Sequence, residues 1–304
     1  MFPPETTYDQ AARFLLRQGG GTLLAWLLDE PPEALRFRRW LDSVLSLPGT
    51  KERLCDAVAR LETPSGEPLA LLVEVQTKPD GSMFGRLGIA GGILWETVRP
   101  SELPGDRYGL TALVVNLTGN GSSGRSFRRA SSVWEISPCE WNLADEDAAE
   151  VLAGVAAGSI PQEVLAFVPA MQNGGEASII TTWLERVRQE PDRRRRGVLT
   201  LAVVFAGLTE WADAWRKALE GFDVMESAIV NEWKAAARLE GAQMAEKKTM
   251  SVAVLRYLRA RFGLVPEDLA QRIDACADVE RLNAFLDASA AASSLDDFRR
   301  VTGV

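Results

Sequence analysis

The pattern of apolar and polar positions changes period once within residues 69–99, LALLVEVQTKPDGSMFGRLGIAGGILWETVR. The stretch opens with an apolar run that predicts a strand covered on both faces of a sheet. Side chains alternate between the faces of a strand, so Glu74 and Gln76 share one face. Turn residues within 77–81 end the run, and from Met83 the apolar positions recur at i, i+4, i+7 and i+11. The pattern therefore predicts a buried strand, a turn and a helix.

A second strand is predicted upstream, in residues 51–61, KERLCDAVARL, which contain Asp56. The segment between the two strands, ETPSGEP at 62–68, is typical of a hairpin turn. A hairpin makes its strands antiparallel neighbours, which can bring Asp56 and Glu74 to the same end of a sheet. A buried carboxylate is costly unless a cation meets it, and a metal ion is the usual solution. The pair is therefore a candidate metal site.

The order of these elements resembles the core of the PD-(D/E)xK nucleases: an aspartate strand, a hairpin, a Glu-x-Gln strand and a helix. The segment at residues 74–87, EVQTKPDGSMFGRL, resembles the corresponding segment of the recombination-promoting nuclease (Rpn) family, which is also classed with transposases. The residues that match the family pattern are Glu74, Gln76, Thr77, Asp80, Met83, Arg86 and Leu87. The resemblance implies an α/β fold with a restriction-endonuclease-like core, in which helices flank a mixed central sheet, followed by an all-helical C-terminal part.

The same resemblance implies a site for Mg²⁺ or Mn²⁺ that hydrolyses phosphodiester bonds. Asp56, Glu74 and the backbone carbonyl of Val75 would hold the ion. Gln76 stands where the wider superfamily has a lysine that positions the attacking water, and the Rpn family itself has glutamine there. An amide can orient a water through one acceptor and two donors, although it carries no charge. Lys78 would supply the missing ammonium if the strand persists that far, and otherwise is a surface lysine at the strand end.

Further residues are assigned around this site, each with an alternative. Asp80 is expected to cap the following helix. Arg86 either contacts phosphate or forms an internal ion pair with an acid. Arg125 and Arg128 are candidate DNA-binding residues, although a solvated arginine face or loop is the simpler interpretation. Asp9 matches an acid that the family carries near the start of its first helix, or is simply a first-turn acid favoured by the helix dipole.

The length and composition of the chain indicate how large a core it can form and how many domains it contains. With 304 residues, 46% of them hydrophobic, it can bury a sizeable core. The predicted nuclease-like domain spans residues 1–170, and a helical extension follows at 171–250. Residues 251–304 are predicted to form a small helical C-terminal domain. This last part resembles a domain of unknown function that often closes Rpn-like chains, and the resemblance implies no chemistry of its own.

The residue types in the chain limit which catalytic mechanisms it can use. The chain contains no histidine, which excludes Ser-His-Asp catalysis, Cys-His catalysis and His-ligated zinc. Its three cysteines lie far apart and suggest neither a metal-binding pair nor a disulfide framework. Hydrolysis would therefore rest on carboxylates, lysine and a bound metal ion. The polar start and the lack of an apolar run long enough for a bilayer predict a cytoplasmic protein with no membrane partner.

Two functional hypotheses of different classes follow. The net charge of −8 disfavours nonspecific coating of nucleic acid but is compatible with local basic residues. The first hypothesis is a Mg²⁺-dependent endodeoxyribonuclease of the recombination-promoting type, with DNA as its partner. The second is a catalytically inactive nucleic-acid-binding or protein-interaction module on the same fold. In the second hypothesis the helical half mediates self-association, which would make the protein a homo-oligomer.

Overall fold

The protein was analysed as a computed structural model in which contacts divide the chain into two units. The structure describes residues 6–31, 33–41, 44–47, 50–53, 55–101, 106–220, 228–274, 276 and 278–304. The first unit comprises Met1–Asp42 and Cys55–Ala235. The second comprises Ser43–Leu54 and Ala236–Val304.

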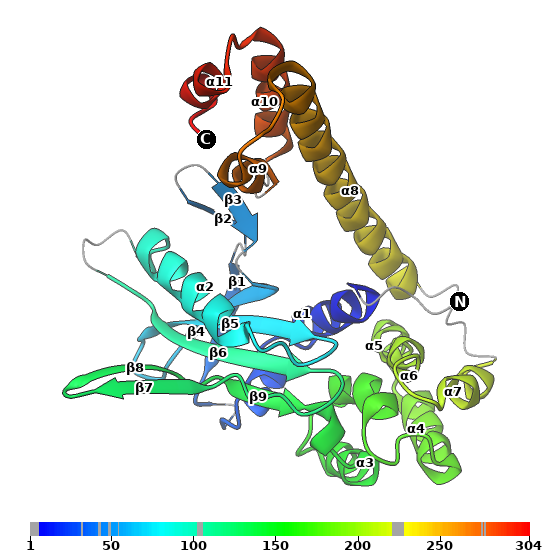
Figure 1. Ribbon diagram of the computed structural model, residues 1–304. Helices are drawn as coiled ribbons and strands as arrows, with labels where there is room; N and C mark the ends of the chain where they lie inside the picture. Colours follow the sequence, from blue (N-terminus) through cyan, green and yellow to red (C-terminus); the bar gives the residue numbers. More distant parts are fainter. Residues whose placement is uncertain are drawn as a thin grey trace. The chain divides into compact units, whose positions relative to one another are not determined.

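A five-stranded sheet forms the centre of the first unit, in the order β1-β4-β5-β6-β9 (Figure 1). Its strands are β1 Arg36–Leu41, β4 Ala57–Glu62, β5 Pro68–Gln76, β6 Gly109–Asn116 and β9 Cys139–Asn142. β1, β4 and β5 are antiparallel neighbours, whereas β5, β6 and β9 run parallel. The carboxyl ends of the parallel strands therefore meet at one edge, where Gln76 pairs with Asn116 and Asn116 pairs with Asn142.

The helix α2, Met83–Thr97, covers one face of this sheet (Figure 1). α2 packs on the sheet at Gly91, where a Cβ would lie 3.5 Å, an ordinary van der Waals distance, from the side chains of both Leu72 and Leu110. Leu72 lies on the same face of β5 as Glu74, since strand side chains alternate. The carboxylate of Glu74 therefore projects toward the layer formed by α2.

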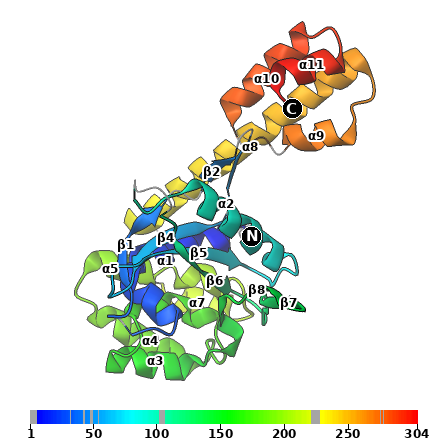
Figure 2. The same cartoon turned by 90° about the vertical axis from the view of Figure 1, so that its left-hand side faces the viewer.

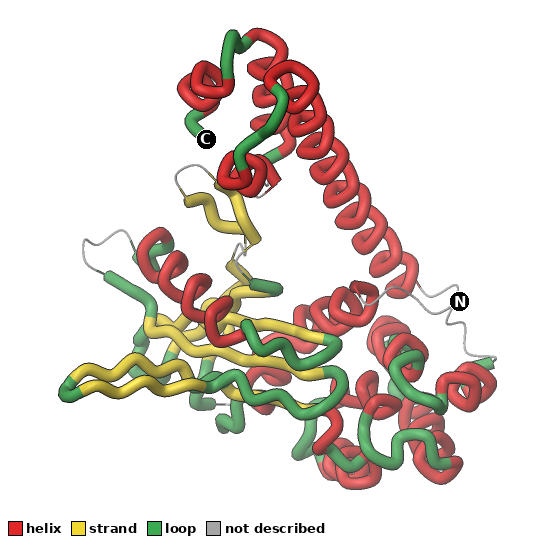
Figure 3. Tube along the Cα trace, viewed as in Figure 1, coloured by secondary structure: helices red, strands yellow, loops and turns green. Residues whose placement is uncertain are grey.

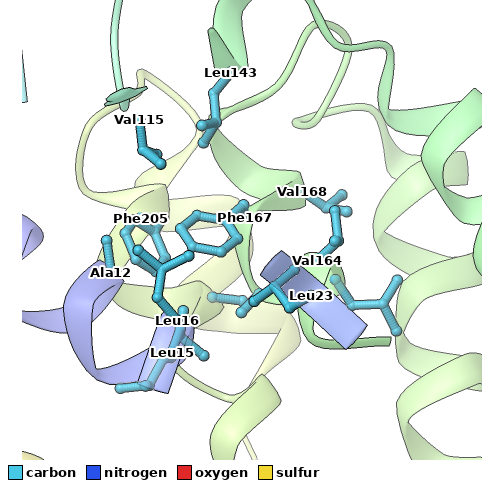
Figure 4. Close-up of a cluster of buried hydrophobic side chains, with 14 of the residues drawn as sticks. Ala12, Leu15, Leu16, Leu23, Val115, Leu143, Val164, Phe167, Val168 and Phe205 are labelled. Carbon is cyan, nitrogen blue, oxygen red and sulfur yellow. The ribbon is translucent and has the colours of Figure 1, made fainter. Parts of the chain in front are cut away.

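The opposite face carries the main hydrophobic core, which α1, Thr6–Leu27, helps to cover (Figures 1 and 2). The positive φ of 54° at Gly20 interrupts this helix. The other helical elements of the unit before residue 220 are η1 Leu143–Asp145, α3 Ala148–Ala157, η2 Gln162–Ala170, α4 Ala177–Gln189, α5 Arg193–Leu199, α6 Ala202–Ala206 and α7 Ala212–Ala218. Phe167 and Phe205 pack with ring centroids 4.7 Å apart beside Leu16 of α1 (Figure 4).

The contacts group the chain differently from the predicted boundaries. Buried residues of α4, α5 and α6 belong to the same core as the sheet, so no contact boundary falls at residue 170. All regular elements that the structure describes after β9 are helical (Figure 3). The second unit begins its helical part at Ala236, within the long helix α8, Ala228–Phe262. The predicted α/β class is confirmed, as a mixed sheet with helices.

The predicted strand at 51–61 is divided between the two units. β4 begins only at Ala57. Thr50–Arg53 is a separate strand, β3, which pairs with β2, Val44–Leu47, in a hairpin grouped with the second unit. The physical reason lies in the sequence, because residues 51–53 are all charged and do not suit a strand that is covered on both faces.

The second unit has its own hydrophobic core, formed by the later part of α8 and three shorter helices. These helices are α9 Glu267–Asp274, α10 Val279–Ala291 and α11 Leu295–Thr302. Phe285 and Phe298 anchor the core with ring centroids 6.1 Å apart. None of the helices that the structure describes combines the length and the apolar composition needed to span a bilayer.

Candidate active site

Glu74 is a fully buried carboxylate with a cation beside it. Its relative exposure is 0%, and its Oε2 accepts a hydrogen bond from a guanidinium nitrogen of Arg86 at 2.7 Å. Arg86 lies in the first turn of α2, on the face of the sheet to which Glu74 points. A second nitrogen of Arg86 lies 3.7 Å from Oδ2 of Asp80. Of the two alternatives for Arg86, the structure has the internal ion pair.

Asp56 lies immediately before β4 and is held against β5. Its Oδ2 accepts the backbone N–H of Val75 at 2.8 Å, taking the place of a ladder carbonyl where β4 has not yet begun. Its Oδ1 lies 3.4 Å from a guanidinium nitrogen of Arg13, and both side chains are largely buried. The hydrogen bond to Val75 places Asp56 beside the strand that carries Glu74. The structure therefore brings the two predicted carboxylates to the same end of adjacent strands.

The first helix contributes two side chains to this end of the sheet. Oδ1 of Asp9 accepts a hydrogen bond from the hydroxyl of Thr77 at 2.7 Å. Arg13, one turn later, reaches Asp56. Sequence analysis named Asp9 and missed Arg13, although the spacing of four residues that puts both on one helix face could have pointed to it.

Gln76 is buried and its amide orientation is fixed by a backbone donor. Its Oε1 accepts the N–H of Asp80 at 3.0 Å, so the amide nitrogen must be the atom that donates to Oδ1 of Asn116 at 2.5 Å. One Nε2–H and one oxygen lone pair remain for other partners. β5 ends at Gln76, so the strand does not persist to Lys78, which is exposed beyond it.

Asn116 extends this polar chain along the carboxyl ends of the parallel strands. Its amide nitrogen donates to Oδ1 of Asn142 at 2.6 Å and to Oε2 of Glu140 at 3.2 Å. Asn142 also accepts the N–H of Gly121 at 2.9 Å, and Glu140 accepts the N–H of Ser123. Residues 118–124, the glycine-serine loop after β6, are thus linked to Gln76 through the buried Asn116 and the half-buried Glu140 and Asn142. Sequence analysis missed this network and identified only Gln76, which ends the predicted apolar run.

Asp80 organises the turn between β5 and α2. Its carboxylate accepts both the N–H of Ser82 at 2.8 Å and the Ser82 hydroxyl at 2.7 Å. These hydrogen bonds, with a smaller contribution from Arg86, hold the pKa of Asp80 below its ordinary value of 3.8. Ser82 is the N-cap residue of α2. The carboxylate therefore binds the residue before the helix rather than the first helical N–H groups that the sequence suggested.

Arg125 and Arg128 lie on a two-stranded hairpin outside the main sheet. Its strands are β7, Arg125–Arg129, and β8, Ser132–Ile136. Both arginines are exposed, and Arg125 donates to the carbonyls of Ser122 and Gly124. Strand alternation puts them on opposite faces. Phe127, on the Arg125 face, packs against Phe84 of α2 with ring centroids 5.6 Å apart.

The carboxylate oxygens at this end of the sheet are the kind of ligand that Mg²⁺ and Mn²⁺ prefer. Mg²⁺ in proteins uses one or two carboxylates and keeps several waters, and Asp56 and Glu74 supply that number. Within the described part of the chain, no group of three or more His, Cys, Asp or Glu side chains is placed to hold a metal ion. An all-protein cage is therefore not available there. An ion bound by these two carboxylates would compete with Arg13 and Arg86 for them.

Comparison of the chain with protein-family models, with curated proteins and with solved structures finds no match. The candidate site is therefore interpreted from its own geometry.

Proposed function

We propose that this protein is a Mg²⁺- or Mn²⁺-dependent DNA endonuclease of the recombination-promoting type. The observation that carries the proposal is the hydrogen bond from the Val75 N–H to Asp56 at 2.8 Å. It supports a site in which Asp56 lies against the strand of the buried Glu74. A buried carboxylate next to a second one is the arrangement that oxygen-ligated divalent ions stabilise.

Each residue has a defined part in this proposal. Asp56, Glu74 and the carbonyl of Val75 would hold the ion, which when bound neutralises the scissile phosphate and lowers the pKa of the attacking water. The remaining Nε2–H of Gln76 donates to the water or to a phosphate oxygen, and Gln76 takes no proton. Arg86 is 45% exposed, so its guanidinium can turn from Glu74 toward the phosphate once an ion neutralises the acid.

Asp9, Asp80 and Lys78 have accessory parts. Asp9 fixes α1 against Thr77, and Asp80 fixes the turn that positions α2. Lys78 lies past the end of β5, where its charge attracts the DNA backbone rather than activating water. Arg125 and Arg128 would add phosphate contacts from opposite faces of the hairpin.

One observation favours the second hypothesis, a catalytically inactive module that binds nucleic acid or protein. Each of the two carboxylates already has an arginine beside it, Arg13 for Asp56 and Arg86 for Glu74. Such pairs offset the charge of the carboxylates without a metal ion. On this alternative the two acids maintain the fold, and DNA binding is the same in Mg²⁺ and in EDTA.

The test is nicking of supercoiled plasmid in Mg²⁺ and in Mn²⁺ by the wild type and by Asp56→Asn and Glu74→Gln. Each variant keeps the shape of the side chain and removes its charge. We expect a loss of more than about a hundredfold in rate, because loss of outer-shell partners alone costs about 10–100-fold at metal sites. Glu96→Gln, an exposed acid of α2, is the matched control and should cut like the wild type. Equal behaviour of all four proteins would reject the assignment.

A further inference from the structure

A groove runs between α8 and α10 of the second unit, which lie beside one another (Figure 2). Its volume is about 630 Å³. The groove is lined by Thr249, Val252, Ala253, Arg256, Tyr257 and Ala260 of α8 and by Leu286, Asp287 and Ala290 of α10. Val252 and Tyr257 are 52% and 45% exposed, which is high for large side chains with an apolar body.

The later part of α8 therefore has two apolar stripes where a surface helix has one. Val254, Leu255 and Leu258 form the first stripe and are buried in the core of the unit. The lining residues of α8 recur at i, i+3, i+4, i+7, i+8 and i+11, the spacing of one helix face, and four of these six, Val252, Ala253, Tyr257 and Ala260, form the second stripe. Its small residues, Ala253 and Ala260, allow another helix to approach closely. The second stripe is shaped for a helical partner.

The charges in the groove indicate which partner. Arg256 on one wall and Asp287 on the other are both exposed, and within the described residues neither forms an ion pair. A polyanion such as DNA would be repelled by Asp287, and an acidic peptide would leave it unpaired. A second copy of this chain presents both signs. In a two-fold symmetric contact, Arg256 of each copy meets Asp287 of the other.

We propose that two copies of the chain associate through this groove, with the outer stripes of the two α8 helices packed against each other. Tyr257 supplies the aromatic anchor typical of interface centres. The crossed Arg256–Asp287 pairs at the sides fix the register of the two copies. This dimer does not depend on the proposed nuclease activity.

The test measures the mass of the full chain by sedimentation velocity over a range of concentrations. The wild type should sediment at twice 33.2 kDa. Arg256→Glu and Asp287→Arg should each raise the dimer dissociation constant by about tenfold or more, because each places like charges opposite one another. The double variant Arg256→Glu/Asp287→Arg restores opposite charges across the two-fold axis and should dimerise again.

Two matched substitutions at exposed apolar positions test whether the dimer forms through the groove or through another part of the surface. Val252→Glu should abolish the dimer, whereas Leu264→Glu, at an 89% exposed position outside the groove, should leave it intact. Both positions are exposed, so neither change disturbs the core, and far-UV circular dichroism checks this. A wild type that is monomeric throughout, or a dimer that survives Val252→Glu, would overturn the proposal. A double charge reversal that stays monomeric would overturn the crossed pairing.

Discussion

Replacement of Arg86 by methionine tests whether Glu74 needs a cation. Oε2 of Glu74 accepts from Arg86 at 2.7 Å, and the Glu74 side chain is 0% exposed. Methionine retains much of the length and apolar body of arginine but removes the charge and the donors. The variant therefore leaves a buried carboxylate without this partner.

The expected cost follows from the burial of the two partners. Breaking a fully buried ion pair costs about 3–5 kcal/mol, and a hydrogen bond to a charged group contributes about 1.5–3 kcal/mol. Because Arg86 is 45% exposed, water screens part of the pair, and the lower range applies. We expect Arg86→Met to lose about 2 kcal/mol, which lowers Tm by about 4–8 °C in a unit of this size.

Tryptophan fluorescence is the suitable assay, because all nine tryptophans lie in the first unit and report its unfolding alone. Urea unfolding in EDTA should show the loss for Arg86→Met. The double variant Arg86→Met/Glu74→Gln should recover about 1–2 kcal/mol of it, since a neutral amide needs no cation. Arg128→Met, the same change at an exposed hairpin position, is the matched control and should lie within about 0.5 kcal/mol of the wild type.

Mg²⁺ adds a second prediction for the same variant. An ion that binds only the native state contributes about 2.7 kcal/mol at a concentration of 100 times its Kd. The ion competes with Arg86 for Glu74 in the wild type and has no such competitor in Arg86→Met. Mg²⁺ should therefore stabilise the variant more than the wild type. An Arg86→Met variant as stable as Arg128→Met, or stabilised by Mg²⁺ no more than the wild type, would refute this reasoning.

Four further changes test the surroundings of the site. Asn116→Ala should cost about 2–3 kcal/mol in urea unfolding and lower the nicking rate, because it removes a buried partner from Gln76 and from the loop. Gly121→Ala should be destabilising, since its Cβ would lie 2.3 Å from the Asn116 amide nitrogen; Gly85→Ala, with open space around it in α2, should stabilise by about 0.5–1 kcal/mol. Asp80→Ala should lower Tm near pH 7, where the native carboxylate is ionised and hydrogen-bonded. Because the pKa of Asp80 is lowered on folding, this difference should shrink as the pH falls below the ordinary value of 3.8 and disappear once the pH is below the lowered pKa of the folded state; a Tm difference that does not shrink with acidification would contradict the role of the charge.

The sequence pattern around β5 and α2 correctly predicted the strand, the turn and the helix in this part of the chain. The apolar run with Glu74 and Gln76 on one face, the turn, and the helical spacing from Met83 all correspond to the structure. These features are local, because hydrophobic periodicity and turn residues can be recognised within a short window of sequence. The strand containing Asp56 was less predictable, since whether 50–53 and 57–62 form one strand depends on their partners.

The features that could not be predicted from the sequence depend on contacts between residues that lie far apart along the chain. Arg13 and Asp56 are far apart in sequence and meet only because α1 packs across the sheet. The Asn116 network depends on the parallel order of β5, β6 and β9, which no single segment encodes. The domain boundary predicted at residue 170 also depends on long-range contacts. A helical composition after that point does not tell whether the helices pack on the sheet or apart from it.

The most direct test of the metal site is a Mn²⁺ titration followed by electron paramagnetic resonance, in which the signal of free Mn²⁺ falls as the ion binds. We expect a single saturable site in the wild type that is lost in both Asp56→Asn and Glu74→Gln and retained in Glu96→Gln. Binding that is absent from the wild type, or equal in all four proteins, would contradict the assignment of Asp56 and Glu74 as the ligands.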